Sequence, residues 1–330
     1  MALELWRIFE RLSGREEGSM GFFDLQVNGY AGIDFNGESL DPERVDEVCS
    51  RLSQEGVEGI LATIITDDLG AMEARLKGLV ALREQAPWLR RILRGFHIEG
   101  PFINPAEGYR GAHPADAVAM ADEGTMEQLL DAADGLTRMV TLAPEMDPVL
   151  KVTRMLAERG VAVSAGHTNA SRDELWAAMD AGLTMFTHFG NGCPALLPRH
   201  DNILHRALSL RERLWFCFIA DGVHVPFFAL KNYLDMVGTD KSIVVTDSIS
   251  AAGLGPGSYR LGRWALTIGE DGVARSPDGS HLVGSTVTMA QSRRNLTQQL
   301  GLDDEAARKL LWGNPRMAIG EGLPGRGSVM

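Results

Sequence analysis

Short apolar runs alternate with amphipathic segments of helical period from Gly21 onwards. Runs of mainly apolar and β-branched residues, bounded by turn residues, are typical of strands that are buried on both faces. In chain order these runs are FFDLQVNG, GILATIIT, ILRGFHI, RMVTLAP, VAVSAG, LTMFTH, LWFCFIADG and SIVVTD. The pattern therefore predicts eight strands.

The segments between these runs carry helix start and stop signals. Asp41-Pro42 opens one segment, Asp147 precedes another, and Gly182 closes a third. The predicted helices span residues 42–56, 69–85, 126–133, 148–159, 171–182 and 226–237. Regular alternation of strand and helix predicts an α/β fold, a (β/α)8 TIM barrel over residues 21–320. An open doubly wound sheet is the alternative. That fold would be expected to carry a glycine-rich phosphate loop after an early strand, and the sequence has none.

The alternation changes after Asp247. A small β excursion with turn signals at Gly262, Asp271-Gly272 and Asp278-Gly279 is predicted near residues 258–285. Helices are expected again at 289–300 and 304–311. Residues 1–20 form a helix-like segment by their apolar spacing, and residues 321–330 are expected to be a C-terminal tail without regular structure.

Composition narrows the class of protein. The chain has 330 residues, 45% of them hydrophobic, and a formal net charge of -12. This charge argues against nonspecific binding to nucleic acid or to an anionic membrane surface. The three cysteines are far apart, so neither a disulfide framework nor a cysteine zinc site is expected. The N-terminus is too charged for a signal peptide. We therefore expect a cytoplasmic protein that binds neither nucleic acid nor membrane.

Polar residues gather where the predicted strands end. Strand three ends in HIEGPF, and strands five and six each stop at a histidine, His167 and His188. In a parallel barrel the carboxyl ends of the strands share one face, on which such enzymes carry their chemistry. A single histidine there is more often a packing residue, but two in the same topological position can meet at one metal ion.

A mononuclear hydrolytic zinc site needs about three protein ligands and one open position for water. Glu99, His167 and His188 supply such a set. Asp247, at the end of VVTD, is the candidate acid/base, although an aspartate there can equally cap a following helix. His113, in the loop RGAHP, is a candidate donor to a substrate carbonyl, and a solvated surface residue is the alternative.

These residues lie in segments that resemble the N-acetylglucosamine-6-phosphate deacetylase family of the amidohydrolase superfamily. The matching segments, in the family's order, are DLQVNGYAGIDFN, GFHIEGPFINP with GAHP, VTLAPE, SAGHTNA, THFGNGCP, IADGVHV, VTDSISAAG and LVGSTVTM. The resemblance implies a distorted TIM barrel of the metal-dependent hydrolase type, a divalent metal ion and hydrolysis of an N-acetyl group.

The resemblance also implies roles for single residues. Glu99, His167 and His188 match the metal ligands, Asp247 the catalytic acid/base, and His113 the donor to the acetyl carbonyl. Arg199 matches an arginine that reaches the phosphate bound by the neighbouring subunit. The positions that match contacts to the sugar or its phosphate are Ala112, His113, Asn191, Gly192, His224, His281, Leu282 and Val283.

The chain departs from the family pattern at three points. Gln26-Val27-Asn28 stands where many amidohydrolases have His-x-His for a second metal, as in single-metal members of the family. HFGNGCP replaces the usual H-x-x-N-A-M-P, so that Gly192 stands for an alanine and Cys193 for a methionine. Little sequence surrounds the barrel, so we expect the family's accessory β-sandwich domain to be absent or vestigial.

The leading hypothesis is metal-dependent deacetylation of an N-acetylated amino sugar, foremost N-acetylglucosamine 6-phosphate. The alternatives are hydrolysis of another small or cyclic amide on the same fold, and a noncatalytic sugar-phosphate-binding protein. One divalent ion per subunit is expected, foremost Zn2+, since a Glu and two His also suit Fe2+, Ni2+ or Co2+. From the family we expect a homodimer.

Overall fold

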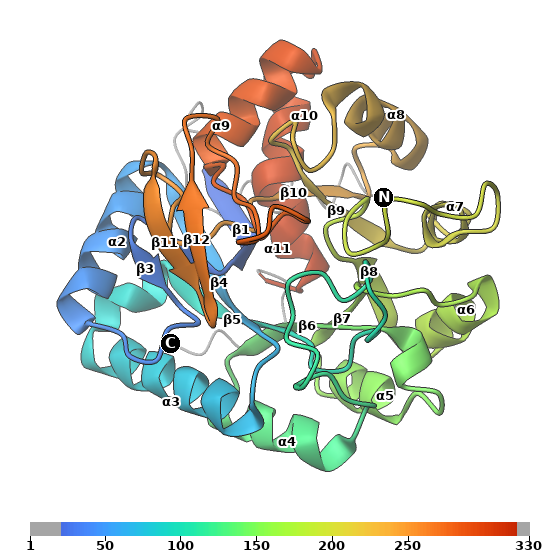
Figure 1. Ribbon diagram of the computed structural model, residues 1–330, viewed down its shortest axis with the longest axis horizontal. Helices are drawn as coiled ribbons and strands as arrows, with labels where there is room; N and C mark the ends of the chain where they lie inside the picture. The colour runs from blue at the N-terminus through green and yellow to red at the C-terminus, as the bar shows by residue number, and fades with distance from the viewer. Residues whose placement is uncertain (1–20, 322–330) are drawn as a thin grey trace.

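Eight parallel strands form a barrel in the computed structural model of the protein, which describes residues 21–321 (Figure 1). Their order in the sheet is their order in the chain. The strands are β1 (Phe22–Val27), β4 (Val57–Ile65), β5 (Leu93–Glu99), β6 (Thr137–Leu142), β7 (Ala162–Ala165), β8 (Leu183–Phe186), β9 (Trp215–Ile219) and β10 (Ser242–Val245). The predicted strands and the predicted (β/α)8 barrel are confirmed.

The barrel is nearly closed, and its last side differs from the others. Ladder pairing joins each strand to the next from β1 to β10. Between β10 and β1, an isolated bridge links Val27 to Ser248. Deeper in the barrel, the carboxylate of Asp24 accepts hydrogen bonds from the backbone N–H (3.2 Å) and the hydroxyl (2.5 Å) of Thr246. A buried side chain thus replaces part of the missing ladder.

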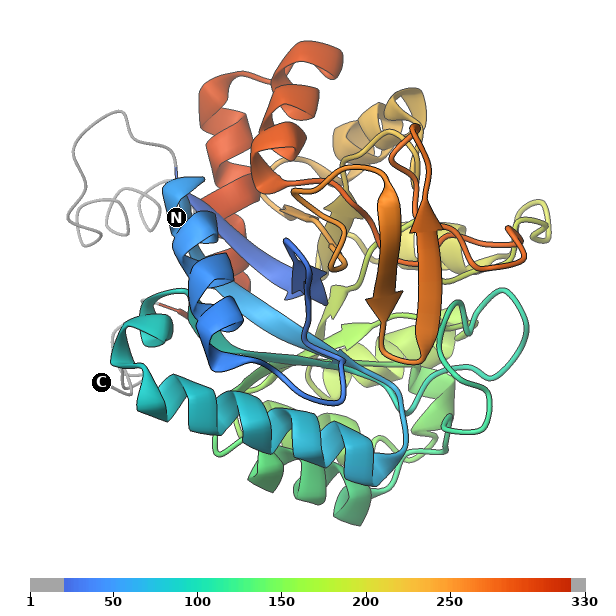
Figure 2. The same ribbon diagram turned by 60° about the vertical axis from the view of Figure 1, so that its left-hand side comes forward.

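Helices cover the outside of the barrel (Figures 1 and 2). α3 has the predicted bounds, and Ser171 caps α6 with a capping box that includes Glu174. The helices between strands are α2 (Pro42–Gln54), α3 (Leu69–Gln85), α4 (Glu123–Ala132), α5 (Lys151–Glu158), α6 (Arg172–Asp180), α7 (Ile203–Leu208) and α8 (Phe227–Val237), with 3-10 turns at η1 (Pro87–Arg91) and η2 (Pro144–Met146).

Some helices differ from the prediction. α4 begins at Glu123, three positions before its predicted start, and two further differences have a physical cause. α5 begins three positions late, because Leu150 is left-handed with φ 55°. The side chain of Asp147 still accepts the N–H groups of Lys151 and Thr153, as a cap would. α7 was not predicted, because its six residues are too few to show a helical period.

The inside of the barrel is layered. Residues two apart on a strand point to the same side. Leu61, Met139 and Met185 belong to a buried apolar cluster, which is closed from below by Trp312. Two positions further along the same strands stand Thr63, Thr141 and Thr187, all buried. The interior therefore changes from apolar to polar towards the carboxyl ends of the strands.

The β excursion is a hairpin, as predicted. β11 (Gly257–Leu261) pairs antiparallel with β12 (Trp264–Ile268), with Gly262 and Arg263 in the turn. It stands beside the carboxyl end of the barrel (Figure 2), near a second short hairpin formed by β2 (Gly29–Tyr30) and β3 (Ile33–Asp34). The chain then continues through α9 (Met289–Arg294), η3 (Asn295–Gln299), α10 (Asp304–Arg308), η4 (Lys309–Gly313) and α11 (Asn314–Ala318), in which η3 and η4 are π-helical.

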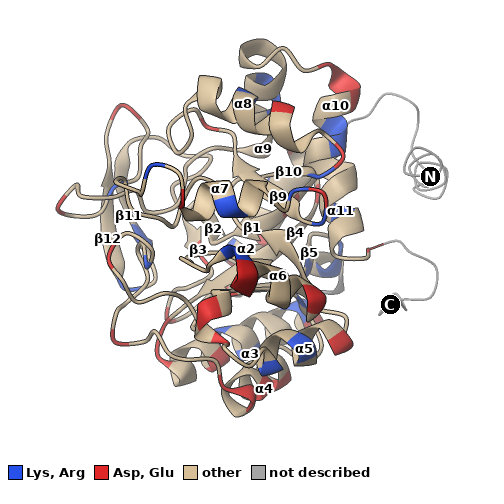
Figure 3. Ribbon diagram, turned by 90° about the vertical axis from the view of Figure 1, so that its right-hand side faces the viewer, with Lys and Arg blue, Asp and Glu red and all other residues tan. Residues whose placement is uncertain are grey.

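Charged residues lie mainly on the outer helices and loops (Figure 3). Within residues 21–321, no helix is long and apolar enough to cross a membrane. The helix-like segment predicted for residues 1–20 and nearly all of the predicted tail at 321–330 lie outside the described residues.

The buried carboxyl at the β1–β10 side predicts a dependence of stability on pH. Burial raises the pKa of Asp24 from 3.8 to about 7, against the opposing hydrogen bonds from Thr246 and Gln26. The folded protein therefore binds this proton more tightly than the unfolded chain does. Its stabilising effect is complete below pH 3.8 and is lost as the pH rises through about 7.

We expect Asp24→Asn to remove this dependence. Relative to the wild type, the variant should gain on the order of a few kcal/mol in free energy of unfolding between pH 4 and pH 7. Urea unfolding across this range measures the difference. Asp131→Asn, at an exposed position, is the control. A difference between Asp24→Asn and wild type that stays constant with pH would contradict the assignment.

Candidate active site

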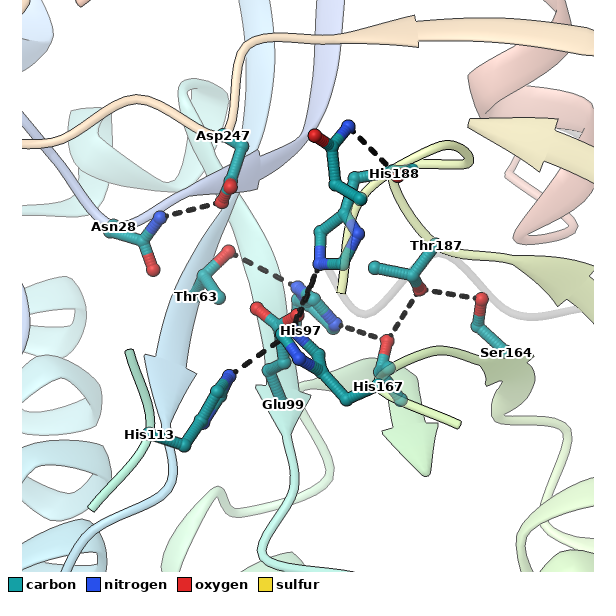
Figure 4. A network of polar contacts seen from close by, with 12 residues as sticks. Asn28, Thr63, His97, Glu99, His113, Ser164, His167, Thr187, His188 and Asp247 are labelled. Carbon is teal, nitrogen blue, oxygen red and sulfur yellow. Dashed lines mark hydrogen bonds and ion pairs between the residues drawn. The ribbon is translucent and has the colours of Figure 1, made fainter. Parts of the chain in front are cut away.

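Three side chains from the ends of different strands converge at the carboxyl end of the barrel (Figure 4). Glu99 ends β5, His167 follows β7 and His188 follows β8. Glu99 Oε1 lies 3.1 Å from His167 Nε2 and 3.0 Å from His188 Nε2, and the two nitrogens are 3.1 Å apart. A tetrahedral metal ion with bonds of about 2.0–2.1 Å would hold its ligand atoms about 3.3 Å apart. The three atoms thus have nearly the spacing of one face of such a site.

The backbone at these strand ends is unusual. His167, His188 and Asp247 have φ angles of 51°, 30° and 50°, in the left-handed region that residues other than glycine rarely adopt. Each such residue costs on the order of 1–3 kcal/mol, and such residues concentrate at functional sites. The three turns bring the side chains towards the barrel axis directly after their strands end.

The hydrogen bonds of His167 test whether a cation fits here. Its Nδ1 lies 2.7 Å from the backbone carbonyl of Tyr109, which can only accept a hydrogen bond. In the neutral ring the proton is therefore on Nδ1, and the lone pair of Nε2 faces the Glu99 carboxylate. Two buried lone pairs at 3.1 Å repel each other unless a cation lies between them. The donor set fits a divalent metal ion.

Charges at the site depend on one another. Burial by itself would raise the pKa of Glu99, but His167 and His188, which donate to this carboxylate when their rings carry a proton on Nε2, hold it well below its ordinary value. Burial would lower the pKa of His188, but the hydrogen bond and charge of Glu99 outweigh burial and raise it. Glu99 is therefore ionised at neutral pH, as a metal ligand must be.

Asp247 lies across the site from these ligands. Its Oδ1 accepts a hydrogen bond of 2.8 Å from Asn28 Nδ2. Burial, followed by the charge of Glu99, raises the pKa of Asp247 to about 6. Among the described residues the next helix after Asp247 begins only at Met289, so the interpretation of Asp247 as a helix cap is wrong.

His113 is buried, so the interpretation of His113 as a solvated surface residue is wrong. Its Nε2 lies 3.3 Å from His167 Nε2, and the two rings meet edge to face. Burial lowers the pKa of His113 to about 3, which leaves the ring neutral at pH 7. Glu99, His113 and His167 also offer ligand atoms within 4.8 Å of one another, a looser group than the set that includes His188.

Gln26 and Asn28 are both buried near the site. Both polar atoms of the Gln26 side chain, and Oδ1 of Asn28, find no hydrogen-bond partner among the described residues. Amides at these two positions are weak ligands for the soft divalent metals that imidazole prefers. The pair therefore favours one metal ion in the pocket over two.

The loop after β8 packs against the ligands. Asn191 donates a hydrogen bond to the carbonyl of His188 (3.1 Å). Gly192, with φ 61°, lies so close that a Cβ would come within 3.1 Å of His167 and 3.2 Å of His188. Arg199, further along this loop, is exposed, and among residues 21–321 it forms no hydrogen bond or ion pair with the metal-ligand group. The structure thus brings Asn191 and Gly192 to the site, but not Arg199.

Other predicted sugar-binding positions lie around the rim. Nδ1 of His224 lies 2.7 Å from Asp221 Oδ2, which fixes the ring. His224 borders a cavity of about 350 Å3 that residues 271–274 and 284–288 also line. Ala112 and Val283 pack in the same apolar cluster, and the ring of His281 meets Trp264 edge to face. Leu282, between His281 and Val283 in the chain, is partly buried.

Sequence reasoning missed the groups that support the ligands. A hydrogen-bonded chain runs beneath them from Thr63 through His97, Thr141 and Thr187 to Ser164 (Figure 4). It links β4, β5, β6 and β7 with the residue after β8. Polar residues within two positions of the ends of otherwise apolar strands were the available signal. The carbonyl of Tyr109 left no signal, since any residue supplies one.

Comparison with known proteins bears on this site. No protein-family model matches the chain. The chain is similar to the N-acetylglucosamine-6-phosphate deacetylase of Bacillus subtilis strain 168, with 31% identity over 280 residues that cover 84% of this chain and 69% of the relative. It is also similar to the N-acetylgalactosamine-6-phosphate deacetylase of Shewanella sp. strain ANA-3, with 33% identity over 286 residues that cover 86% and 69%.

Solved structures agree with these relatives. A mutant N-acetyl-D-glucosamine-6-phosphate deacetylase from Mycobacterium smegmatis, in complex with N-acetyl-D-glucosamine-6-phosphate, superposes with a TM-score of 0.81 and 30% identity over 92% of this chain and 78% of that chain. The deacetylase from Thermotoga maritima gives 0.80 and 29% over the same shares. The fold and the sequence thus agree, and the chain belongs to the N-acetylglucosamine-6-phosphate deacetylase family of the amidohydrolase superfamily.

Proposed function

We propose that this protein hydrolyses the N-acetyl group of an amino sugar 6-phosphate, foremost N-acetylglucosamine 6-phosphate, to acetate and the free amine. The observation that carries the proposal is the convergence of Glu99, His167 and His188 within 3.1 Å, with His113 and Asp247 beside them. Relatives that are named for this reaction support it. N-acetylgalactosamine 6-phosphate is the second candidate substrate, because the relative from Shewanella is named for that sugar.

Glu99, His167 and His188 would hold one divalent metal ion per subunit, foremost Zn2+, with Fe2+, Ni2+ or Co2+ as alternatives. When bound, the ion supplies Lewis-acid activation of the attacking water and of the acetyl carbonyl. The tautomer of His167 and the ionised Glu99 support this assignment.

Asp247 acts as the acid and base. As a carboxylate it takes a proton from the attacking water, and it then gives this proton to the departing amine nitrogen. A pKa of about 6 suits both steps near neutral pH. Asn28 donates to one carboxylate oxygen and leaves the other free to accept the proton. His113, which is neutral, donates a hydrogen bond to the acetyl oxygen as negative charge develops there.

Residues on the rim would bind the sugar phosphate. Asn191, Gly192 and His224 face the phosphate, and Ala112 with His281, Leu282 and Val283 closes over the sugar. Arg199 would reach the phosphate in the partner subunit of a homodimer, which accords with its exposure here. We also propose a cytoplasmic location, in keeping with the buried thiols of Cys49 and Cys217.

Metal content tests the ligand set. We expect about one equivalent of divalent metal per chain after dialysis, and a loss of tight binding in Glu99→Gln, which removes the charge but keeps the shape. Elemental analysis measures both. Glu145→Gln is the control. Glu145 is a partly buried carboxylate that accepts hydrogen bonds from Asn104 and Thr168. Two equivalents in the wild type would contradict the role given to Gln26 and Asn28.

Acetate release tests the reaction itself. The enzyme should release acetate from N-acetylglucosamine 6-phosphate or its galactosamine epimer, and more slowly from the unphosphorylated sugars. Asp247→Asn should keep the metal and lower kcat about 10²–10⁴-fold, because the acid/base is lost. Binding of the phosphorylated sugars without any acetate release by the wild type would indicate a noncatalytic protein. Turnover of Asp247→Asn within about tenfold of wild type would remove Asp247 from the mechanism.

A shared phosphate site makes a prediction about mixed dimers. Arg199→Ala should raise KM for the phosphorylated sugar and leave the unphosphorylated sugar nearly unchanged, because a remote binding contact is lost. In a heterodimer of Arg199→Ala with Asp247→Asn, the site with intact Asp247 receives Arg199 from the other chain. KM near the wild-type value in verified heterodimers supports the shared site, whereas an unrestored KM assigns Arg199 to its own subunit or to the bare surface.

A further inference from the structure

Apart from its contact with His167, the ring of His113 has no hydrogen-bond partner among the described residues that would orient it over the ligands. Its Nδ1 is buried and finds no hydrogen-bond partner among the described residues, and its Nε2 faces His167 at 3.3 Å. Most histidines at such sites are oriented by a hydrogen bond to the ring nitrogen that does not react. Since His113 lacks one, the direction of its ring depends on the loop that carries it.

This loop lies directly on the metal-ligand group. The carbonyl of Tyr109 accepts from His167, and a Cβ on Gly111 would come within 3.1 Å of the His167 ring. Inside the loop, the guanidinium of Arg110 donates to the carbonyl of His113 (2.8 Å). A shift of this segment by about 1 Å would therefore move His113 relative to the reacting atoms.

The loop is fastened from outside by the turn of the β11–β12 hairpin. Trp264 Nε1 donates a hydrogen bond of 2.6 Å to the carbonyl of Ala112, the residue before His113. Arg263 Nη1 lies 2.9 Å from Asp116 Oδ2, and its Nε lies 2.5 Å from Asp67 Oδ1 at the end of β4. Figure 2 shows the hairpin turn beside this loop.

The hairpin is itself anchored to the barrel at this end. Asp67 also binds Arg75 on α3 at 2.7 Å, and this pair is almost fully buried. The N–H of Gly262 donates to Asp34 Oδ2 (2.7 Å). Ala112 packs in the apolar cluster that joins Leu261 and Leu266 to the barrel. The turn thus connects the barrel to the loop that carries His113.

We propose that the hairpin turn positions His113 for catalysis. Trp264 fixes the backbone immediately before His113, and Arg263 ties the far end of the loop to β4 through Asp116 and Asp67. Both are positioning residues, because they act through His113 and touch neither the ligand group nor the place of the acetyl group. This inference rests on the proposed deacetylase function, in which His113 donates to the acetyl oxygen.

The test is a double-mutant cycle in the metal-loaded enzyme. Trp264→Phe keeps an aromatic ring and removes the N–H donor. It should lower kcat about 10- to 100-fold, the loss that a misplacement of about 1 Å can cause, with KM within about twofold of wild type. In a His113→Ala background the same change should cost less than about twofold, because the group that it positions is gone.

Each variant has a matched control. Trp176→Phe removes an indole N–H from an exposed tryptophan on α6, which is far from the loop in the sequence. Arg263→Ala should act like Trp264→Phe, whereas Arg159→Ala removes an arginine of nearly equal exposure, 43% against 42%, from an ion pair on the outer helices. Arg263→Lys should restore part of the lost kcat.

A second measurement does not depend on turnover. Hydrogen exchange of the backbone amides in residues 110–117 should become faster in Trp264→Phe and Arg263→Ala and stay unchanged in the two controls, with metal content at the wild-type level in all four. An equal loss of kcat with and without His113, or unchanged exchange in this loop, would overturn the proposal. A wild type that releases no acetate from any sugar would instead overturn the proposed function and leave the exchange result to be judged separately.

Discussion

The active site depends on holding one carboxylate oxygen and two imidazole nitrogens within 3.1 Å of one another. A carboxylate and two imidazole nitrogens at this spacing are stable together only if protons or a cation compensate their lone pairs. The hydrogen bond from His167 to Tyr109 commits the proton of that ring to the far side. The lone pairs of the Glu99 carboxylate and of the two imidazoles then face one another, an arrangement suited to a divalent ion.

The barrel sustains this arrangement in two ways. Parallel strands bring all their carboxyl ends to one face, so ligands that are 68 and 89 positions from Glu99 in the chain become neighbours. Beneath them, the chain of hydroxyl groups around His97 satisfies the polar atoms of the upper interior layer. The left-handed turns at His167 and His188 follow directly on strands that carry this layer.

Much of this followed from the sequence, and the exceptions share a cause. The strand ends identified Glu99, His167 and His188, because a local pattern of apolar runs determines which residues end a strand. The local pattern could not decide whether Asp247 is an acid/base or a helix cap, because its hydrogen-bond partner Asn28 is 219 positions away. The burial of His113 was missed for the same reason, because its loop is held by Trp264, 152 positions from Ala112. The role of Arg199 still depends on a second chain, which a single sequence does not describe.

The uneven closure of the barrel divides the site into two halves with different mechanical support. The proposed metal ligands come from β5, β7 and β8, which belong to one continuous run of paired strands. Asp247 and Asn28 come from β10 and β1, where the ladder is interrupted and a buried carboxyl bridges the gap. Local opening would therefore begin between β1 and β10, where Asp247 lies, and would leave the β5–β8 side with Glu99, His167 and His188 intact. On warming, molecules that still hold their metal but no longer turn over substrate should therefore appear before global unfolding. The metal-bound fraction would then be larger than the fraction of active enzyme.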